Sequence, residues 1–200
     1  MSDPRLQAPS AQRNRAPILD VLKRVLPKSG TVLEIASGSG EHVIHFAKCL
    51  PDLTFQPSDI YVESLKSIGA WVASSGVPNI LPPLHLDVTQ ESWPIKAADA
   101  VICINMIHIS PWESAQGLIA GAAKLLPVGG VLYLYGPYKR DQQHTAPSNA
   151  DFDADLKARN PAWGVRDLGD VSQCASVAGF AKPDVVEMPA NNLSVVFRRR

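Results

Sequence analysis

The sequence predicts an α/β fold: a mostly parallel seven-stranded sheet with helices on both faces, closed by an antiparallel C-terminal hairpin. Two observations predict it. Short apolar runs alternate with amphipathic runs along most of the chain, which is typical of parallel strands joined by helices. The run at residues 100–104 is wholly apolar, as expected of a central strand buried on both faces. Without internal repeats or linkers, we expect residues 1–200 to form one domain.

The elements are predicted in order from periodicity and from residues that interrupt it. A helix is expected at 17–26, a strand at 31–36, a helix at 40–50, a strand at 53–57 and a helix at 61–74, which Gly76 and Pro78 end. A strand at 80–86, the central strand at 98–105, a helix at 112–126 and a strand at 131–135 follow. Strands and helices therefore alternate up to residue 135, except between the strands at 80–86 and 98–105, where no helix is predicted.

The pattern changes after residue 135. Residues 136–149 are polar and without periodicity, which is typical of functional or disordered loops, and we interpret 136–170 as a lid or substrate segment. Helices are expected at 151–158 and 171–178. Strands at 184–188 and 193–197 are joined by four residues, so they should pair antiparallel. The polar residues 1–16 are expected to cover the pocket.

Composition excludes several classes of protein. Lys plus Arg equals Asp plus Glu at 19 each, and this neutral balance argues against a dedicated nucleic-acid binder. Cys49, Cys103 and Cys174 are far apart and match no metal-ligand spacing, which suits a reducing compartment, and no metal site is expected. No apolar run is long enough to span a bilayer. We expect a cytoplasmic protein with no membrane partner; its oligomeric state stays open.

A glycine-rich loop joins the first predicted strand to the next helix. It reads Glu-Ile-Ala-Ser-Gly-Ser-Gly at 34–40. Glycines permit a tight turn and close approach of a ligand to the backbone, and the helix N-terminus offers free N–H groups. A nicotinamide dehydrogenase would carry a third glycine at the dinucleotide spacing, which this loop lacks. The loop therefore predicts a ligand site of another kind.

Further polar residues follow the other predicted strands. Asp59 follows the second strand, where a carboxylate can accept hydrogen bonds from two ribose hydroxyls or can cap the next helix. Asp87 follows the third strand as a ligand group or a turn residue, and Asn105 ends the fourth. In open parallel sheets the ligand crevice lies beyond the carboxyl ends of the strands, so these residues should converge.

These features, taken in order, resemble the class I S-adenosylmethionine (SAM)-dependent methyltransferases. The loop at 34–40 resembles their E-x-G-x-G-x-G motif with Ala36 at the first glycine, and LPVGG at 126–130 resembles their L-x-P-G-G turn. The chain is also similar to a narrower family of small methyltransferase-like proteins of unknown function. That resemblance rests on SAQRN at 10–14, QPSD at 56–59, YGPYKR at 135–140, NPAWGVRD at 160–167 and MPANNL at 188–193.

The resemblance implies a Rossmann-like fold and SAM as cofactor. It places the adenine, the ribose and the methyl donor against the loops that follow the first four strands. The cofactor-binding residues it implies are Glu34, Ala36, Ser37, Gly38, Gly40, Asp59, Ile60, Asp87, Val88, Asn105 and Met106.

The candidate substrate-binding and catalytic residues lie in segments that core packing alone does not explain. We expect Arg13, Asn14, Lys139, Arg140 and Asn191 to bind substrate; the three cations suit a carboxylate or phosphate, although each also fits a solvated surface. His108 and Tyr138 are the candidate catalytic residues, with His108 either a general base or a histidine that only hydrogen-bonds.

Three functions remain open from the sequence. The first is a SAM-dependent methyltransferase acting on a small polar molecule, for which an anionic one is an option. The second is a SAM-binding regulatory protein without turnover. The alanine at the first glycine position of the motif, Ala36, and the absence of an unambiguous general base favour it. The third is a methyltransferase on protein or RNA, which the neutral charge disfavours.

Overall fold

The computed structural model describes residues 3–200, and its centre is one seven-stranded sheet. The strand order is β3-β2-β1-β4-β5-β9-β8. The five strands β1 (Gly30–Ile35), β2 (Leu53–Asp59), β3 (Leu84–His85), β4 (Ala100–Ile104) and β5 (Val131–Gly136) run parallel. β8 (Asp184–Met188) and β9 (Asn192–Arg198) pair antiparallel at the other edge. The predicted fold class is confirmed, hairpin included.

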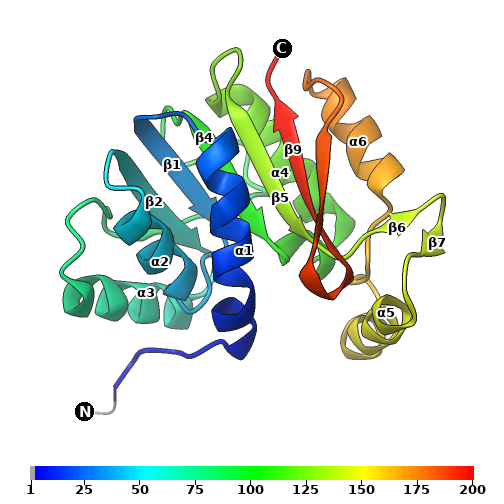
Figure 1. The fold of residues 1–200 in the computed structure, drawn as a ribbon, viewed down its shortest axis with the longest axis horizontal. Helices are drawn as coiled ribbons and strands as arrows, with labels where there is room; N and C mark the ends of the chain where they lie inside the picture. The colour runs from blue at the N-terminus through cyan, green and yellow to red at the C-terminus, as the bar shows by residue number, and fades with distance from the viewer. Residues whose placement is uncertain (1–2) are drawn as a thin grey trace.

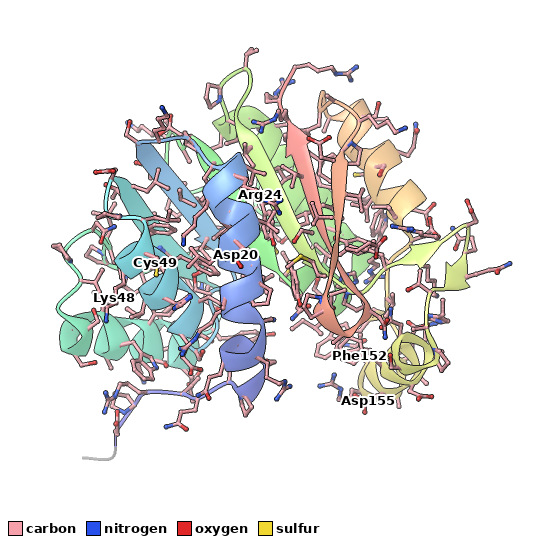
Figure 2. All side chains as sticks on the ribbon, viewed as in Figure 1. Asp20, Arg24, Lys48, Cys49, Phe152 and Asp155 are labelled. Carbon is pink, nitrogen blue, oxygen red and sulfur yellow. The ribbon has the colours of Figure 1, made fainter. Side chains whose placement is uncertain are left out.

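Helices cover both faces of this sheet (Figure 1). α1 (Pro9–Val25), α2 (Glu41–Cys49) and α3 (Val62–Ser75) lie with one face, and α4 (Trp112–Leu125) and α6 (Leu168–Val177) with the other. Side chains alternate along β1, because Val32 enters the α1–α2 core and Leu33 the α4–α6 core. On α1, Ile18 and Leu22 are fully buried, whereas Asp20 and Arg24 lie on the outer face (Figure 2). The sheet is therefore buried on both sides.

The largest departures from the predicted elements occur at segment ends. α1 begins at Pro9, eight residues before the predicted start, because Pro9 suits the first helical position. The third predicted strand shortens to β3: of its earlier residues, Ile80 makes only a single parallel bridge to Phe55. The first three strands and the helices between them otherwise follow the predicted order.

The polar segment after β5 contains more regular structure than predicted. β6 (Lys139–Arg140) and β7 (Gln143–His144) form a small antiparallel hairpin, and α5 (Pro147–Arg159) begins four residues before its predicted start. Asp141 and Gln142 connect the two strands with φ of 52° and 63°, the left-handed pair that a tight hairpin turn requires. Because no glycine marks this turn, the hairpin was not predicted from the sequence. Two short 3₁₀ helices, η1 (Met106–His108) and η2 (Pro189–Asn191), follow β4 and β8.

Candidate cofactor and acceptor cavities

A cavity of about 360 Å³ lies beyond the carboxyl ends of β1 to β4, and we call it the strand-end cavity. Its volume is within the usual range for small-molecule sites. The loops that follow these strands supply most of its walls, and Trp163 closes it from a distant part of the chain. The lining residues are Ile35, Ala36, Gly38, Asp59, Ile60, Tyr61, Ser64, Leu86, Asp87, Val88, Met106, Ile109, Ser110, Pro111, Ser114 and Trp163.

The glycine-rich loop holds a conformation that few residues adopt. Ala36, Gly38 and Gly40 have φ of 54°, 57° and 93°. A Cβ on Gly40 would lie 3.0 Å from the Cα of Ile68, so the chain needs glycine there. Ala36 occupies the left-handed region at an energetic cost, and such strain persists where the surroundings impose it. Ala36, which stands where the motif has its first glycine, is therefore a strained residue in the cavity wall.

Asp59 connects this loop to the end of β2. Its Oδ2 accepts a hydrogen bond from the Gly38 amide at 2.9 Å, and its Oδ1 accepts one from the Tyr61 amide at 3.0 Å. Each carboxylate oxygen retains a second lone pair, so Asp59 can still accept two donors from a ligand. The predicted choice between helix cap and ligand group is resolved in a third way, because Asp59 braces the loop while it lines the cavity.

Glu34 lies behind this wall. Its carboxyl group is buried and its Oε2 has no hydrogen-bond partner. Burial raises the pKa of Glu34 to about 8, and the nearby negative charge of Asp59 contributes. Glu34 is thus largely protonated at neutral pH, and it supports the loop from beneath, where the Ser37 and Ser58 hydroxyls donate to its main-chain carbonyl.

Asp87 closes the edge of the cavity near β3. Its Oδ1 accepts hydrogen bonds from the Thr89 amide at 2.9 Å and the Thr89 hydroxyl at 2.7 Å, and these bonds lower the pKa of Asp87. The carboxylate is therefore ionised and fixed in orientation. Asp87 serves the turn and also lines the cavity, as Asp59 does.

Seven of the eleven predicted cofactor residues line the strand-end cavity: Ala36, Gly38, Asp59, Ile60, Asp87, Val88 and Met106. Glu34, Ser37 and Gly40 instead shape the loop from behind, and Asn105 faces a different cavity. The sequence interpretation missed Ser110 and Pro111 after η1. A Ser-Pro pair before a predicted helix was the available sign, since it marks a turn.

A second cavity, of about 530 Å³, lies between α1, α5 and η2, and we call it the α1 cavity. It gathers Arg13, Asn14 and Asn191, three of the five predicted substrate residues. Phe152 contributes from α5, which lies beneath the β8–β9 hairpin in Figure 2. The full lining is Ser10, Arg13, Asn14, Pro17, Asn105, Tyr135, Pro137, Ser148, Asn149, Phe152, Pro189, Ala190, Asn191 and Asn192.

Hydrogen bonds hold the amides of the α1 cavity. The Oδ1 of Asn14 lies 2.8 Å from His42 Nε2, and Asn14 also bonds the hydroxyl of Tyr135. Burial lowers the pKa of His42 to about 4, so His42 is neutral at pH 7 and Asn14 is held by uncharged partners. Asn191 has φ of 58° and donates to Ser148 Oγ at 3.1 Å. Several of the side-chain amides that line the cavity are thus held in place by hydrogen bonds.

The linings of the two cavities meet at the end of β4. Asn105 lines the α1 cavity, and the next residue, Met106, lines the strand-end cavity. Asn105 has φ of 63°, and its amide donates to the Tyr135 carbonyl at 2.8 Å. This left-handed residue turns the chain sharply between the two cavities. The end of β4 is therefore a wall that both cavities share.

The predicted catalytic residues lie behind the walls. His108 and Tyr138 are fully buried, line none of the cavities described in this section, and pack edge-on with ring centroids 5.0 Å apart. The Arg166 amide donates to His108 Nδ1 at 3.2 Å, and burial lowers the pKa of His108 to about 3. Burial raises the pKa of Tyr138 well above its usual value. Neither side chain reaches a ligand in this conformation, so the expectation of direct catalysis is not supported.

The three predicted substrate cations do not converge either. Lys139 lies 3.3 Å from Asp153 and lines a separate cavity of about 630 Å³ between α4 and α6. Arg140 forms an exposed ion pair with Glu187 at 2.7 Å. Only Arg13 faces the α1 cavity. The β6–β7 hairpin, which the sequence did not reveal, carries the other two cations away.

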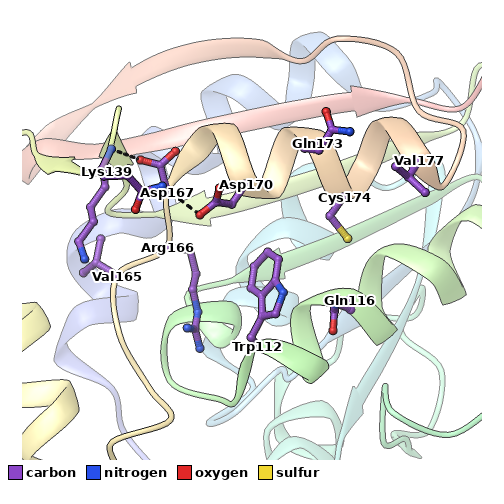
Figure 3. A pocket seen from close by; sticks show the side chains of 11 residues that line it. Trp112, Gln116, Lys139, Val165, Arg166, Asp167, Asp170, Gln173, Cys174 and Val177 are labelled. Carbon is purple, nitrogen blue, oxygen red and sulfur yellow. Dashed lines mark hydrogen bonds between the residues drawn. The ribbon is translucent and has the colours of Figure 1, made fainter.

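Several polar groups of the α4–α6 cavity make structural contacts (Figure 3). Asp167 caps α6 through the Gly169 amide at 2.7 Å. Arg166 lies 5.8 Å from the ring centroid of Trp112 and donates to the carbonyls of Ile107 and Ser110. These contacts fix η1 and thereby one wall of the strand-end cavity, so this larger cavity supports the site rather than forming it. Within residues 3–200, no cluster of three His, Cys, Asp or Glu side chains is arranged to hold a metal ion.

Sheet order and strand-end cavity together define a class of protein: the fold is that of the class I SAM-dependent methyltransferases. The chain belongs to the family described as "Protein of unknown function (DUF938)", which matches residues 5–199. The resemblance to a small methyltransferase-like family of unknown function is thereby confirmed. In the part of the chain that the structure describes, no helix is long and apolar enough to cross a membrane.

Solved structures share this fold at low sequence identity. An O-methyltransferase family protein from Burkholderia thailandensis superimposes with a TM-score of 0.79 at 20% identity, covering 95% of this chain and 57% of that one. A putative O-methyltransferase from Nostoc punctiforme gives 0.82 at 18%, covering 94% and 56%. Human N-acetylserotonin methyltransferase, in complex with SAM, gives 0.80 at 14%, covering 95% and 52%. The chain spans little more than half of each, and the likeness shows the fold alone.

A curated relative is similar along most of the sequence. The tRNA (guanine-N(7)-)-methyltransferase of Shewanella pealeana is 26% identical over 191 residues, which cover 91% of this chain and 71% of the relative.

Proposed function

We propose that this chain is a SAM-dependent methyltransferase that binds SAM in the strand-end cavity and a small, polar, anionic acceptor in the α1 cavity. The observation that carries the proposal is the meeting of the two cavities at Asn105 and Met106. Methyl transfer needs a donor and an acceptor held in line at close distance, and two cavities lined by adjacent residues would hold the two molecules near each other, with the methyl group passing where the cavities open to one another.

The donor set of the strand-end cavity fits SAM. Asp59 offers two oxygens for ribose hydroxyls, Asp87 offers a fixed carboxylate near the expected adenine position, and Leu86 and Val88 provide apolar surface. When bound, SAM supplies a methyl group activated by a positively charged sulfur. The chain's own residues would bind and orient it, and Trp163 would help to exclude water. Structural relatives crystallised with SAM, such as the human N-acetylserotonin enzyme, support this assignment.

The charge of the α1 cavity favours an anionic acceptor. Arg13 is the only charged side chain that lines it, and no carboxylate within 4.0 Å pairs with Arg13 among residues 3–200. A guanidinium binds carboxylate and phosphate groups through two parallel hydrogen bonds. The amides of Asn14 and Asn191 and the ring of Phe152 complete a surface for a small polar molecule. In this proposal the chain is one domain, in which Arg13 and Asn14 of the segment 1–16 and Phe152 of the segment 136–170 line the acceptor cavity.

Titration calorimetry with S-adenosylhomocysteine (SAH) and SAM tests the donor half. We expect binding of both, and absence of binding at millimolar concentration would refute the proposal.

Incubation of wild-type and Arg13→Ala protein with labelled SAM and cell extract tests the acceptor half. Label is expected in an anionic small-molecule fraction for wild type and is expected to fall strongly for Arg13→Ala. Binding without transfer to any fraction would favour the regulatory alternative.

Methylation of tRNA is the second candidate, which the Shewanella relative favours. The net charge of zero disfavours it, because binding to a polyphosphate chain relies on clustered cations. Label in the RNA fraction of the same experiment, with salt-sensitive retention of the protein on immobilised tRNA, would replace the small acceptor by tRNA.

A further inference from the structure

The residues that precede α1 lie against α3 rather than over either cavity. The Leu6 amide donates to Ser67 Oγ at 2.8 Å, and Trp71 Nε1 donates to the Leu6 carbonyl at 3.0 Å. The guanidinium of Arg5 lies 5.1 Å from the centroid of the Trp71 ring. In Figure 1 this segment passes beneath α3 before the chain turns into α1. Residues 5–12, which we call the strap, are thus anchored at a defined place.

Ser67 joins the strap to the glycine-rich loop. It is fully buried, and its hydroxyl accepts from the Leu6 amide while it donates to the Ser39 carbonyl at 2.7 Å. A hydroxyl has one hydrogen to donate, so the bond to Ser39 uses it completely. The Ser67 side chain therefore bonds both the strap and the glycine-rich loop.

Glu41 makes the second link. Its Oε2 accepts from the Ala8 amide at 2.6 Å and from Ser39 Oγ at 3.0 Å, and its Oε1 accepts from Gln12 Nε2 at 3.1 Å. Although burial raises the pKa of this carboxyl, the hydrogen bonds from Gln12, Ala8 and Ser39 outweigh it, and the net shift is downward. An ionised Glu41 thus bonds strap and loop at once.

The loop needs such external support. Ser39 lies between Gly38 and Gly40, both left-handed, and Ala36 is a left-handed alanine. The glycines adopt this region without strain, whereas a left-handed alanine persists only when surrounding contacts impose it. The Ser67 hydroxyl and the Glu41 carboxylate both form a hydrogen bond with Ser39.

We propose that the strap holds the 36–40 loop in its ligand-binding conformation, with Ser67 and Glu41 as positioning residues. This inference rests on the proposed function, because the loop is part of the proposed SAM site. It assigns the N-terminal segment to the donor side of the protein, in addition to the acceptor residues that α1 supplies.

Hydrogen exchange measured by mass spectrometry on the full, unliganded chain tests the link directly. Glu41→Gln and Ser67→Ala are expected to raise exchange over residues 36–41 several-fold while exchange in β4 and β5 stays unchanged. Trp71→Phe removes only a strap contact and is expected to produce a smaller rise over the same residues. Glu63→Gln is the matched control, since Glu63 is an exposed acid in the first turn of α3 and should leave exchange unchanged.

Calorimetry with SAH supplies the second readout. We expect Kd to rise about three- to tenfold in Glu41→Gln and Ser67→Ala, the effect of one or two lost hydrogen bonds, and to stay within twofold in Glu63→Gln. Unchanged exchange over 36–41 in both variants, or a rise that is equal throughout the chain, would overturn the inference. Failure of the wild type to bind SAH would overturn the proposed function instead, and the exchange experiment would still decide whether the strap holds the loop.

Discussion

The two cavities that meet at β4 are built in opposite ways. The strand-end cavity takes its walls from loops that directly follow strands of one parallel sheet, and only Trp163 comes from far along the chain. The α1 cavity combines residues from Ser10 to Asn192, carried by α1, β5, α5 and η2. The first inherits its shape from the sheet, whereas the second exists only after long-range packing. Substitutions should therefore affect the two cavities separately.

Asp59→Ala should have the largest effect and should be confined to the donor side. It removes the two proposed ribose acceptors and leaves the Gly38 amide without its partner, so we expect SAH affinity to fall about 100-fold or more. Calorimetry measures this loss. Arg13→Ala is the matched change on the acceptor side and should leave SAH affinity within twofold. Equal losses in both variants would contradict the division into donor and acceptor cavities.

Gly136→Ala tests the packing behind the shared wall. A Cβ at this position would lie 2.5 Å from His108 Nε2 and 3.2 Å from Asn105 Oδ1. We expect the free energy of unfolding, measured by urea denaturation, to fall by about 2–3 kcal/mol. Gly69→Ala is the control, because a Cβ there meets no atom within 4 Å and the helix α3 should gain slightly from it. A neutral Gly136→Ala would show that the wall is loosely packed.

Asp153→Asn tests how the segment after β5 is held. The Asp153 carboxylate accepts from the Val165 amide at 2.7 Å and pairs with Lys157 at 2.7 Å, Lys139 at 3.3 Å and His144 at 3.2 Å, so it joins the β6–β7 hairpin, α5 and the chain before α6. Although burial opposes it, these partners lower the pKa of Asp153 to about 2.

The sign of the pH dependence follows from that shift. The pKa of Asp153 lies below its ordinary value of 3.8, so its stabilisation is complete above about pH 4 and is lost as the pH falls toward 2. Asp153→Asn should lower the free energy of unfolding at pH 7 by on the order of 1–2 kcal/mol and should reduce the loss of stability between pH 4 and 2. Identical acid profiles for the two proteins would show that Asp153 does not hold the segment.

Ala36→Gly should have the smallest effect, and of the opposite sign. Alanine at φ of 54° carries a cost that glycine does not, partly offset by the greater freedom of glycine in the unfolded chain. We expect the free energy of unfolding to rise by about 0.5–1 kcal/mol, with SAH affinity unchanged or improved. Weaker SAH binding would mean that the Ala36 methyl group itself contacts the ligand.

The lining of the strand-end cavity was largely predictable, because spacing along the sequence places its residues; that they bind a cofactor stays a prediction. Each of Ala36, Asp59, Asp87 and Met106 follows a strand, and parallel strands bring their carboxyl ends to one edge. The residues that stabilise the glycine loop, Ser67 and Glu41, carried no such pattern, since one lies in mid-helix and the other at a helix start. The predicted convergence of the cations depended on a hairpin that has no sequence signal. Lys139 and Arg140 flank a turn without glycine, so the β6–β7 hairpin that carries them was not predicted.

The sequence by itself determined the order of strands and helices, the antiparallel C-terminal hairpin and the edge of the sheet at which the strand-end cavity lies. These follow from local periodicity and from turn residues, which act over a few positions. Only the tertiary structure decided that His108 is buried, that Arg13 alone among the candidate cations faces the α1 cavity, and that Ser67 and Glu41 connect the strap to Ser39. Burial and partner choice depend on contacts between segments distant in sequence, and the local pattern of residues does not encode them.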